Sequence, residues 1–158
     1  MGAIAFLPDL CTGCQSCEMV CSLSHGGISS PFFSRIQIKK WSEIAVFLPV
    51  VCQQCENPPC IDVCPTKARK RVPETGAVVT DETWCVGCKS CIYACPYSAP
   101  VLHPATGKTM TCDLCGGKPL CVTACTAGAL SDTADGKLSP EGNEALGRKM
   151  ILSFGKGR

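Results

Sequence analysis

The chain has 158 residues, 16 of them cysteine, and a formal net charge of +2. Its length corresponds to a single domain, and its 15 basic and 13 acidic residues lack the basic excess typical of nucleic-acid-binding proteins. The longest apolar run, residues 44–51, is too short to cross a membrane. The apolar share of 46% includes the cysteines, and without them it is roughly 35%, below that of a typical globular domain. We therefore expect bound groups to complete a thin core.

The first third of the chain contains one cysteine group and the sequence patterns of three strands. A short strand is predicted for residues 3–7 and ends in a proline-containing turn. The first cysteine group follows with the spacing C-x2-C-x2-C-x3-C, and its members are Cys11, Cys14, Cys17 and Cys21. Gly13 precedes the second cysteine and lets the backbone curl toward the thiols. Residues 33–41 alternate as in a half-buried strand, and residues 44–51 predict a second, more buried strand.

Three further cysteine groups follow. The second has the spacing C-x2-C-x4-C-x3-C, and its members are Cys52, Cys55, Cys60 and Cys64. The basic run at residues 67–71 comes next, and we interpret it as counter-charge for a bound anion or as a docking surface for an acidic partner. A strand predicted at residues 76–80 leads into the third group, which repeats the spacing of the first with Cys85, Cys88, Cys91 and Cys95. The fourth group, C-x2-C-x5-C-x3-C, consists of Cys112, Cys115, Cys121 and Cys125. A short terminal helix or docking tail is predicted within residues 131–158.

Other residues near the cysteines are expected to support them. An alanine stands four positions after the last cysteine of three groups, which predicts a turn packed tightly there: Ala68, Ala99 and Ala129. The large aromatic residues are expected to pack beside the same sites: Trp41, Trp84, Tyr93 and Tyr97. His25 and His103 are expected to be polar surface residues or hydrogen-bond donors toward ligands. Because the sequence has no glycine-rich nucleotide loop and no nucleophile–base arrangement, we do not expect the chain to be catalytic on its own.

The four groups use all 16 cysteines. Groups one and three have the spacing of bacterial ferredoxins, in which thiolates bind [4Fe–4S] clusters. Zinc is the main alternative, because all-cysteine zinc sites use two C-x2-C pairs, and it would make the chain a zinc-binding interaction module. All four groups, however, keep three residues between the third and last cysteines, which favours four [4Fe–4S] clusters.

Thiol chemistry also bears on location and charge. A disulfide scaffold would need an oxidising compartment. The first residues lack the basic and long apolar regions of a signal peptide, so we expect a cytoplasmic protein, with export alongside a signal-bearing partner as the alternative. Ligation removes the thiol protons and adds four cores of about 2+ each, which takes the net charge to about −6. The lysines and arginines then serve as counter-charge, and we expect no nucleic-acid partner and no membrane span.

Residues 1–131 resemble the four-cluster iron–sulfur subunits of the dimethyl-sulfoxide-reductase and formate-dehydrogenase type. The resemblance rests on the four cysteine groups and their neighbours: Val51-Cys-Gln-Gln-Cys-Glu-Asn-Pro-Pro-Cys60, Cys64-Pro65-Thr66, Cys85 to Pro96, and Thr111-Cys-Asp-Leu-Cys115. It implies an α+β fold of two nested bacterial-type ferredoxin modules, with short strands and turns around the clusters. The single domain, residues 1–158, would hold an inner module at about 50–100, an outer module at about 1–30 plus 101–131, and a tail at 132–158.

The same resemblance implies an electron-transfer subunit. Such a subunit carries electrons one at a time between a catalytic tungsten- or molybdenum-pterin subunit and a second redox partner, such as a flavoprotein or a ferredoxin. Because the chain is shorter than many of these subunits, it is also similar to the soluble polyferredoxin subunits of carbon monoxide dehydrogenases and of tungsten aldehyde oxidoreductases, and we favour the aldehyde oxidoreductase small subunit. A free, diffusible polyferredoxin is the alternative. An entry and an exit surface would also allow head-to-tail self-association.

The prolines predict which cysteines share a cluster. Groups two and three end in Cys-Pro, whereas groups one and four do not. Because proline fixes φ, the backbone should leave the cluster with one geometry in the groups that end in Cys-Pro and with another in the groups that do not. We therefore expect group two to pair with group three and group one with group four. Within each pair, each group supplies its fourth cysteine to the cluster of the other. The predicted ligand sets are Cys11, Cys14, Cys17 and Cys125; Cys112, Cys115, Cys121 and Cys21; Cys52, Cys55, Cys60 and Cys95; and Cys85, Cys88, Cys91 and Cys64. Sequential pairing, one with two and three with four, is the alternative.

Overall fold

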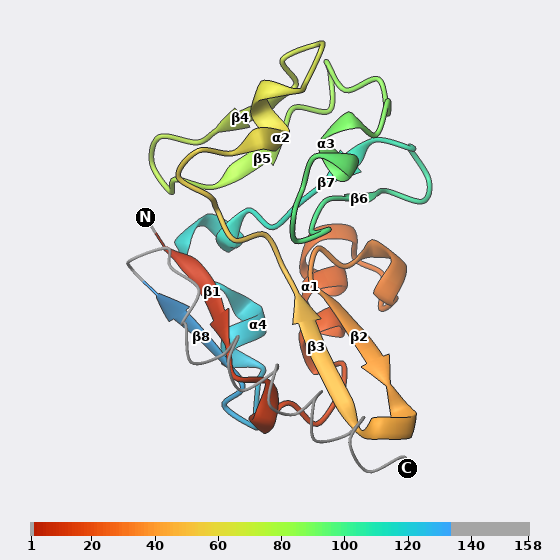
Figure 1. Cartoon of the computed structure of the whole chain (residues 1–158), viewed down its shortest axis with the longest axis vertical. Coiled ribbons are helices and arrows are strands. Elements are labelled where there is room, and N and C mark those ends of the chain that lie inside the picture. Colours follow the sequence, from red (N-terminus) through yellow and green to blue (C-terminus); the bar gives the residue numbers. More distant parts are fainter. Residues whose placement is uncertain (1, 134–158) are drawn as a thin grey trace, which may run out of the picture.

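The structure is a computed structural model that describes residues 2–133. From residue 134 onward, the predicted terminal helix or docking tail lies outside the described residues. Figure 1 shows two lobes, one above the other; the chain passes to the upper lobe after β3 (Val46–Val50) and returns to the lower lobe after β7 (Thr109–Met110). Each lobe is built from two-stranded antiparallel sheets and short helices. The predicted α+β class, with short strands and few helices, is confirmed.

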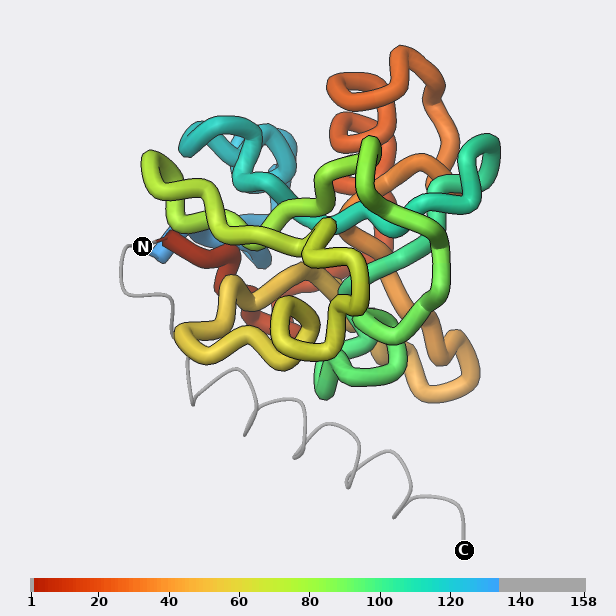
Figure 2. Tube along the Cα trace, turned by 90° about the horizontal axis from the view of Figure 1, so that it is seen from above, coloured from red at the N-terminus to blue at the C-terminus, as the bar shows by residue number. Residues whose placement is uncertain are grey.

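The lower lobe in Figure 1 is closed by the two ends of the described chain. Its elements are β1 (Ala3–Phe6), α1 (Ser16–Gly26), β2 (Gln37–Trp41), β3 (Val46–Val50), α4 (Leu120–Thr123) and β8 (Leu130–Thr133). β1 pairs with β8, β2 pairs with β3, and α1 contacts α4. Figure 2 shows the same closure from above, with the red N-terminal strand beside the blue segment that ends the described chain.

The upper lobe holds the middle of the chain. Its elements are α2 (Pro59–Asp62), β4 (Arg69–Arg71), β5 (Val78–Thr80), α3 (Ser90–Tyr93), β6 (Val101–Leu102) and β7 (Thr109–Met110). β4 pairs with β5, β6 pairs with β7, and β5 contacts β7. The predicted outer module includes residues 101–110, but the structure places β6 and β7 in the lobe of α2 and α3 (Figure 1). Short 3-10 turns complete the described chain at Pro8–Leu10, Pro31–Phe33, Ser42–Ile44 and Leu114–Gly117.

The predicted strands are present, although each is shorter than expected. Those at residues 3–7, 44–51 and 76–80 correspond to β1, β3 and β5. The strand predicted at residues 33–41 begins only at Gln37, because a 3-10 turn that starts at a proline precedes it. Its predicted alternation is confirmed, since Ser34, Ile36 and Ile38 are all buried.

The core is thin and rich in thiols. Its main apolar members are Ile4, Phe6, Ile36, Val51 and Leu114. Five cysteines belong to the same buried cluster: Cys17, Cys21, Cys52, Cys112 and Cys121. Among residues 2–133, no helix has the length and apolar character needed to cross a membrane.

Alanines, rather than aromatic rings, occupy the positions closest to the cysteine turns. Ala68, Ala99 and Ala129 are only 1%, 4% and 3% exposed, as predicted. The prediction that aromatic residues pack beside the cysteines is wrong for Trp84 and Tyr93, which are 64% and 83% exposed. Trp41 also lies at the surface. Tyr97 lines a pocket together with Cys60 and Cys95, as predicted, although part of its ring is exposed.

Candidate metal centres

The four cysteine groups share one local backbone geometry. The third cysteine is always the second residue of a helix, and α1, α2, α3 and α4 carry Cys17, Cys60, Cys91 and Cys121 in this position. The residue before the second cysteine is always left-handed: Gly13 (φ 69°), Gln54 (φ 49°), Gly87 (φ 68°) and Leu114 (φ 60°). The glycine pattern signals this conformation in two groups, but nothing in the sequence signals it at Gln54 and Leu114. The four groups therefore repeat the same backbone conformation as well as the same spacing of cysteines.

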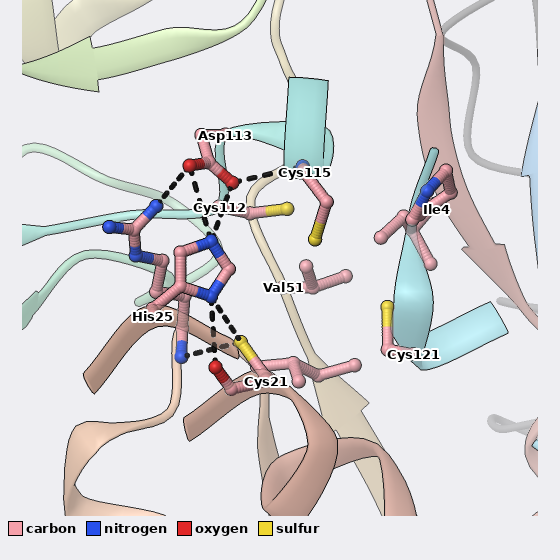
Figure 3. Close-up of a pocket in the computed structure, with 11 residues that line it drawn as sticks. Ile4, Cys21, His25, Val51, Cys112, Asp113, Cys115 and Cys121 are labelled. Atoms are coloured by element: carbon pink, nitrogen blue, oxygen red, sulfur yellow. Dashed lines mark hydrogen bonds and ion pairs between the residues drawn. The ribbon is translucent and has the colours of Figure 1, made fainter. Parts of the chain in front are cut away.

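Twelve of the sixteen thiols line three pockets, and we number each site by the group that supplies three of its four cysteines. Site 1 is a pocket lined by Cys11, Cys14, Cys17 and Cys125. Site 2 is a pocket lined by Cys52, Cys55, Cys60 and Cys95. Site 4 is a pocket lined by Cys112, Cys115, Cys121 and Cys21, whose sulfurs Figure 3 shows around one space. Sites 1 and 4 each combine three cysteines of one group with the fourth cysteine of the other. Site 2 combines three cysteines of group two with Cys95, the fourth cysteine of group three.

The remaining thiols, Cys85, Cys88, Cys91 and Cys64, form the predicted set that we number site 3. Thr109 of β7 contacts two of them, because its backbone N–H donates to Cys85 Sγ at 3.5 Å and its Oγ1 lies 3.5 Å from Cys91 Sγ. Cys64 follows α2, which contacts α3, the helix that carries Cys91.

The separation of the thiols distinguishes a cluster from a single zinc ion. At a Zn–S distance of about 2.3 Å, the sulfurs of a tetrahedral zinc site lie about 3.8 Å apart. In residues 2–133, which include every cysteine, the only group of three ligand atoms within 4.8 Å of one another is His25, Asp113 and Cys115. No three thiols are that close, so the spacing fits a cube of four irons, with a thiolate at each iron, better than a zinc ion.

A charged network borders site 4 (Figure 3). His25 Nδ1 lies 2.9 Å from the Cys21 carbonyl oxygen and 3.8 Å from Cys21 Sγ, while its Nε2 lies 3.1 Å from Asp113 Oδ1. The Arg35 guanidinium also pairs with Asp113. The hydrogen bond to Asp113, followed by those to Cys115 and Cys21, raises the pKa of His25 to about 12. Burial opposes ionisation of Asp113, but His25 and Arg35 outweigh it and hold the pKa of this carboxyl well below its usual range. Of the two roles predicted for His25, the structure supports the donor near a ligand.

Backbone amides also donate to thiols at site 4. The N–H of Arg35 donates to Cys21 Sγ at 3.3 Å, and that of Leu114 donates to Cys112 Sγ at 3.4 Å. Hydrogen bonds of this kind favour the thiolate form, orient the ligand and tune the potential of a bound cluster.

At site 2 the neighbouring charge is a buried arginine. Arg69 of β4 is 2% exposed, and its Nη2 donates to Cys60 Sγ at 3.3 Å. Its Nε–H has no partner within the described part of the chain. An orphaned buried donor beside four thiols fits a bound anionic group that would accept its hydrogen bond. The basic run thus divides, because the next residue, Lys70, is exposed and pairs with Asp81 at 2.9 Å.

The thiols differ strongly in exposure. Cys14 of site 1 and Cys88 of site 3 are exposed, and each lies 3.5 Å from a serine hydroxyl, which lowers its pKa. Burial instead raises the pKa of Cys17 and Cys121 to about 12 and that of Cys52 to about 11. Metal binding at the buried positions therefore has to displace protons that these thiols otherwise keep.

The four sites adjoin in one order. Sites 1 and 4 meet where α1, which carries Cys17 and Cys21, contacts α4, which carries Cys121. Sites 2 and 4 meet where Gln54 Nε2 donates to the Cys112 carbonyl oxygen at 2.9 Å. Sites 2 and 3 meet where α2 contacts α3. The order through the molecule is therefore 3, 2, 4, 1, with an exposed cysteine at each end.

Known proteins share these features. The family model of the 4Fe-4S dicluster domain matches residues 44–134, and a 4Fe-4S binding domain matches residues 8–24. The chain is 43% identical, over 122 residues, to the polyferredoxin-like subunit of an aliphatic sulfonate oxidoreductase from Pyrococcus furiosus, covering 77% of this chain and 70% of the relative. It is 37% identical, over 138 residues, to one subunit of the anaerobic dimethyl sulfoxide reductase of Escherichia coli, covering 76% of this chain and 67% of the relative.

A solved structure is also similar. One subunit of the active site complex BamBC of benzoyl coenzyme A reductase, in complex with benzoyl-CoA, superposes with a TM-score of 0.52 and 25% identity. The match covers 97% of this chain and 89% of that subunit.

The 4Fe-4S domains and the 16 cysteines fit four [4Fe–4S] clusters. The chain therefore belongs to the 4Fe-4S dicluster domain family, together with polyferredoxin-like and iron–sulfur subunits of dimethyl-sulfoxide-reductase-type and related oxidoreductases.

Proposed function

We propose that this chain is an electron-transfer subunit that holds four [4Fe–4S] clusters and links a catalytic oxidoreductase subunit to a second redox carrier. The observation that carries the proposal is the grouping of the thiols, since three pockets are each lined by four cysteines of a matching set. A cluster bound in such a set accepts and releases one electron at a time. The chain's own residues hold the sets in a row and control their charge.

The proposed ligand sets are those of sites 1 to 4, in two nested modules. Helix α1 illustrates how one segment serves two sites, because Cys17 lines site 1 and Cys21 lines site 4. These two residues lie one helical turn apart on the same face, so the second thiol reaches the next site along. In groups two, three and four, the short helix that carries the third cysteine ends two residues before the fourth, and the two cysteines keep the same offset in sequence.

The order of the sites supports a route with two ends. Site 3 and site 1 are terminal, and each has one exposed cysteine through which an electron can enter or leave. The surface around site 3 also carries Trp84, Val86 and Tyr93, which are 64%, 69% and 83% exposed. Exposed aromatic side chains are enriched at protein interfaces. We therefore propose that a redox protein with its own electron-transfer group near its surface docks at the site 3 end. Head-to-tail self-association of this chain stays a prediction.

The finer identity of the partner rests on the family. The relatives include a subunit of an aliphatic sulfonate oxidoreductase and a subunit of dimethyl sulfoxide reductase. We propose a catalytic partner of the tungsten- or molybdenum-pterin type, with the tungsten aldehyde oxidoreductases as the favoured class and a cytoplasmic location. A flavoprotein or a ferredoxin is the proposed second carrier.

One purification tests these points together. The tagged chain is isolated anaerobically from its native cells, and iron, sulfide, zinc, tungsten and molybdenum are measured in the recovered material. The expected result is about sixteen iron and sixteen sulfide per chain, with a large pterin-metal subunit in constant ratio. Stoichiometric zinc would refute the cluster proposal. A brown protein with full iron but no partner would instead favour a free polyferredoxin.

A further inference from the structure

Arg69 makes direct contact with a proposed cluster ligand from a fully buried position. Its Nη1 donates to Thr80 Oγ1 at 2.7 Å and to Thr111 Oγ1 at 2.9 Å, and its Nη2 donates to Cys60 Sγ at 3.3 Å. The two hydroxyls are neutral, and no ion pair found in the described chain includes Arg69. The guanidinium is therefore a buried cation held by neutral groups and one thiol.

A buried cation without a counter-ion is strongly destabilising. The bound group at site 2 removes this penalty, because four thiolates around a four-iron core of about 2+ carry a net charge of about −2. Each electron that enters the site adds one unit of negative charge and requires no bond change. Arg69 therefore stabilises the reduced state of site 2 more than the oxidised state, and the effect is large because burial weakens solvent screening.

At the other sites, buried charge next to a proposed ligand is partly offset, better solvated or of the opposite sign. At site 4, His25 and Arg35 share the Asp113 carboxylate, which offsets part of their positive charge, and their side chains are 16% and 23% exposed. At site 1, Glu18 is 3% exposed and follows Cys17 directly in the sequence. Both of its oxygens accept hydrogen bonds at 2.8 Å, from the Ile38 N–H and from Gln15 Nε2, as expected of a carboxylate. A negative charge there disfavours reduction of site 1.

We propose that Arg69 raises the reduction potential of site 2 above that of the other three sites, so that the first electron delivered to the chain resides there. This inference rests on the proposed function, since it requires a bound cluster at site 2. The electron comes from a one-electron donor at either end of the row, and a one-electron acceptor at the other end removes it. Site 2 lies inside the row, so a stored electron is kept away from both exposed ends.

The test is a reductive titration of the anaerobically purified full chain, followed by electron paramagnetic resonance. The decisive variant is Arg69→Met, because methionine replaces the aliphatic stem of arginine with an unbranched apolar side chain and removes the charge. Lys70→Met is the matched control, because it removes the same charge from the neighbouring residue of β4, whose side chain is 57% exposed. A Cys55→Ala variant identifies the site 2 signal as the component that it loses.

In the wild-type protein, the site 2 signal is expected to be the first to develop. Arg69→Met should make reduction of site 2 at least tenfold less favourable, a shift of 59 mV or more for one electron, and should leave the other three components in place. Lys70→Met should leave all four components unchanged. The proposal is overturned if the site 2 signal is not the first, if Arg69→Met leaves it unmoved, or if Lys70→Met shifts it equally.

If Arg69→Met loses iron, a second variant still tests the effect of the charge on the reduction of site 2. The Arg69→Lys variant keeps the charge, so it should hold its iron and keep site 2 as the first component reduced. An Arg69→Lys variant that loses the cluster, or in which site 2 is no longer first, overturns the proposal, because the role of Arg69 would then be structural. Failure of the proposed function looks different, since the wild-type protein itself would then lack four reducible components.

Discussion

Phe6 of β1 pairs with Leu130 of β8 in an antiparallel sheet that joins the two ends of the described chain. The adjoining Leu7 N–H donates to the Ala129 carbonyl at 2.9 Å and extends the contact. Both segments lead directly into site 1, whose thiols come from residues 11–17 and from Cys125. The first cysteine group therefore depends on residues more than a hundred positions away in the sequence.

Leu130→Ala tests this dependence. Leu130 is 5% exposed and lines site 1, so its truncation should lower the free energy of unfolding by about 2–5 kcal/mol. Iron should be lost from site 1 before the other sites. The neighbouring Ser131 is exposed, and Ser131→Ala serves as the control with an expected change within about 0.5 kcal/mol. Equal effects of the two substitutions, measured by denaturation and iron release, would argue against closure through β8.

The exchange of fourth cysteines is testable by crossing substitutions. Cys21→Ala and Cys121→Ala should each leave about twelve iron per chain, and so should the double variant, because both residues belong to one four-iron site. Cys21→Ala combined with Cys60→Ala should leave about eight, because those residues belong to two sites. Sequential pairing predicts the reverse for the two double variants. Iron analysis of the four purified variants therefore decides between the pairings.

Gly87 is expected to be irreplaceable in the third cysteine group. Its φ is +68°, and an added Cβ would lie 2.6 Å from the Gly107 carbonyl oxygen. Gly107 has nearly the same φ, +66°, but open space around it. Gly107→Ala should cost about 1–2 kcal/mol from backbone strain alone, whereas Gly87→Ala carries the clash in addition. The thermal midpoint of the iron-loaded protein should fall further for Gly87→Ala, and equal midpoints would contradict the close approach.

Removal of the metal should unfold the chain. Seven of the buried core residues are cysteines, and without bound groups the remaining apolar contacts are few. Circular dichroism should show loss of helix and strand signals when iron and sulfide are stripped, and amide protection should disappear. A metal-free chain that still unfolds cooperatively would show that the protein side chains suffice for the fold.

The parts of the structure that the sequence predicts are local. The turns after the last cysteines are correct in three groups, because the cysteine spacing fixes the backbone there and only a small residue fits at Ala68, Ala99 and Ala129. The alternation through Ile36 and Ile38 is likewise a property of neighbouring residues. Such signals do not depend on how distant segments meet.

The features that the sequence does not predict depend on distant contacts. Arg69 stands in a run of basic residues that looks like a solvated surface, and its burial makes sense only beside an anion that the sequence does not contain. His25 and Asp113 are 88 positions apart, and they meet where the segment of the fourth cysteine group packs against α1. The exposure of Trp84 and Tyr93 is unexpected for a related reason. Large aromatic residues are normally buried within their own chain, and the sequence does not reveal whether a partner protein covers them instead.

Controlled-potential reduction of the anaerobically purified protein measures its capacity to carry electrons most directly. With four [4Fe–4S] clusters in sites 1 to 4, the protein should take up about four electrons, one at each site, and release the same number on reoxidation. An uptake of two electrons or fewer in protein with full iron content, or no reversible uptake at all, would contradict a four-site electron-transfer subunit.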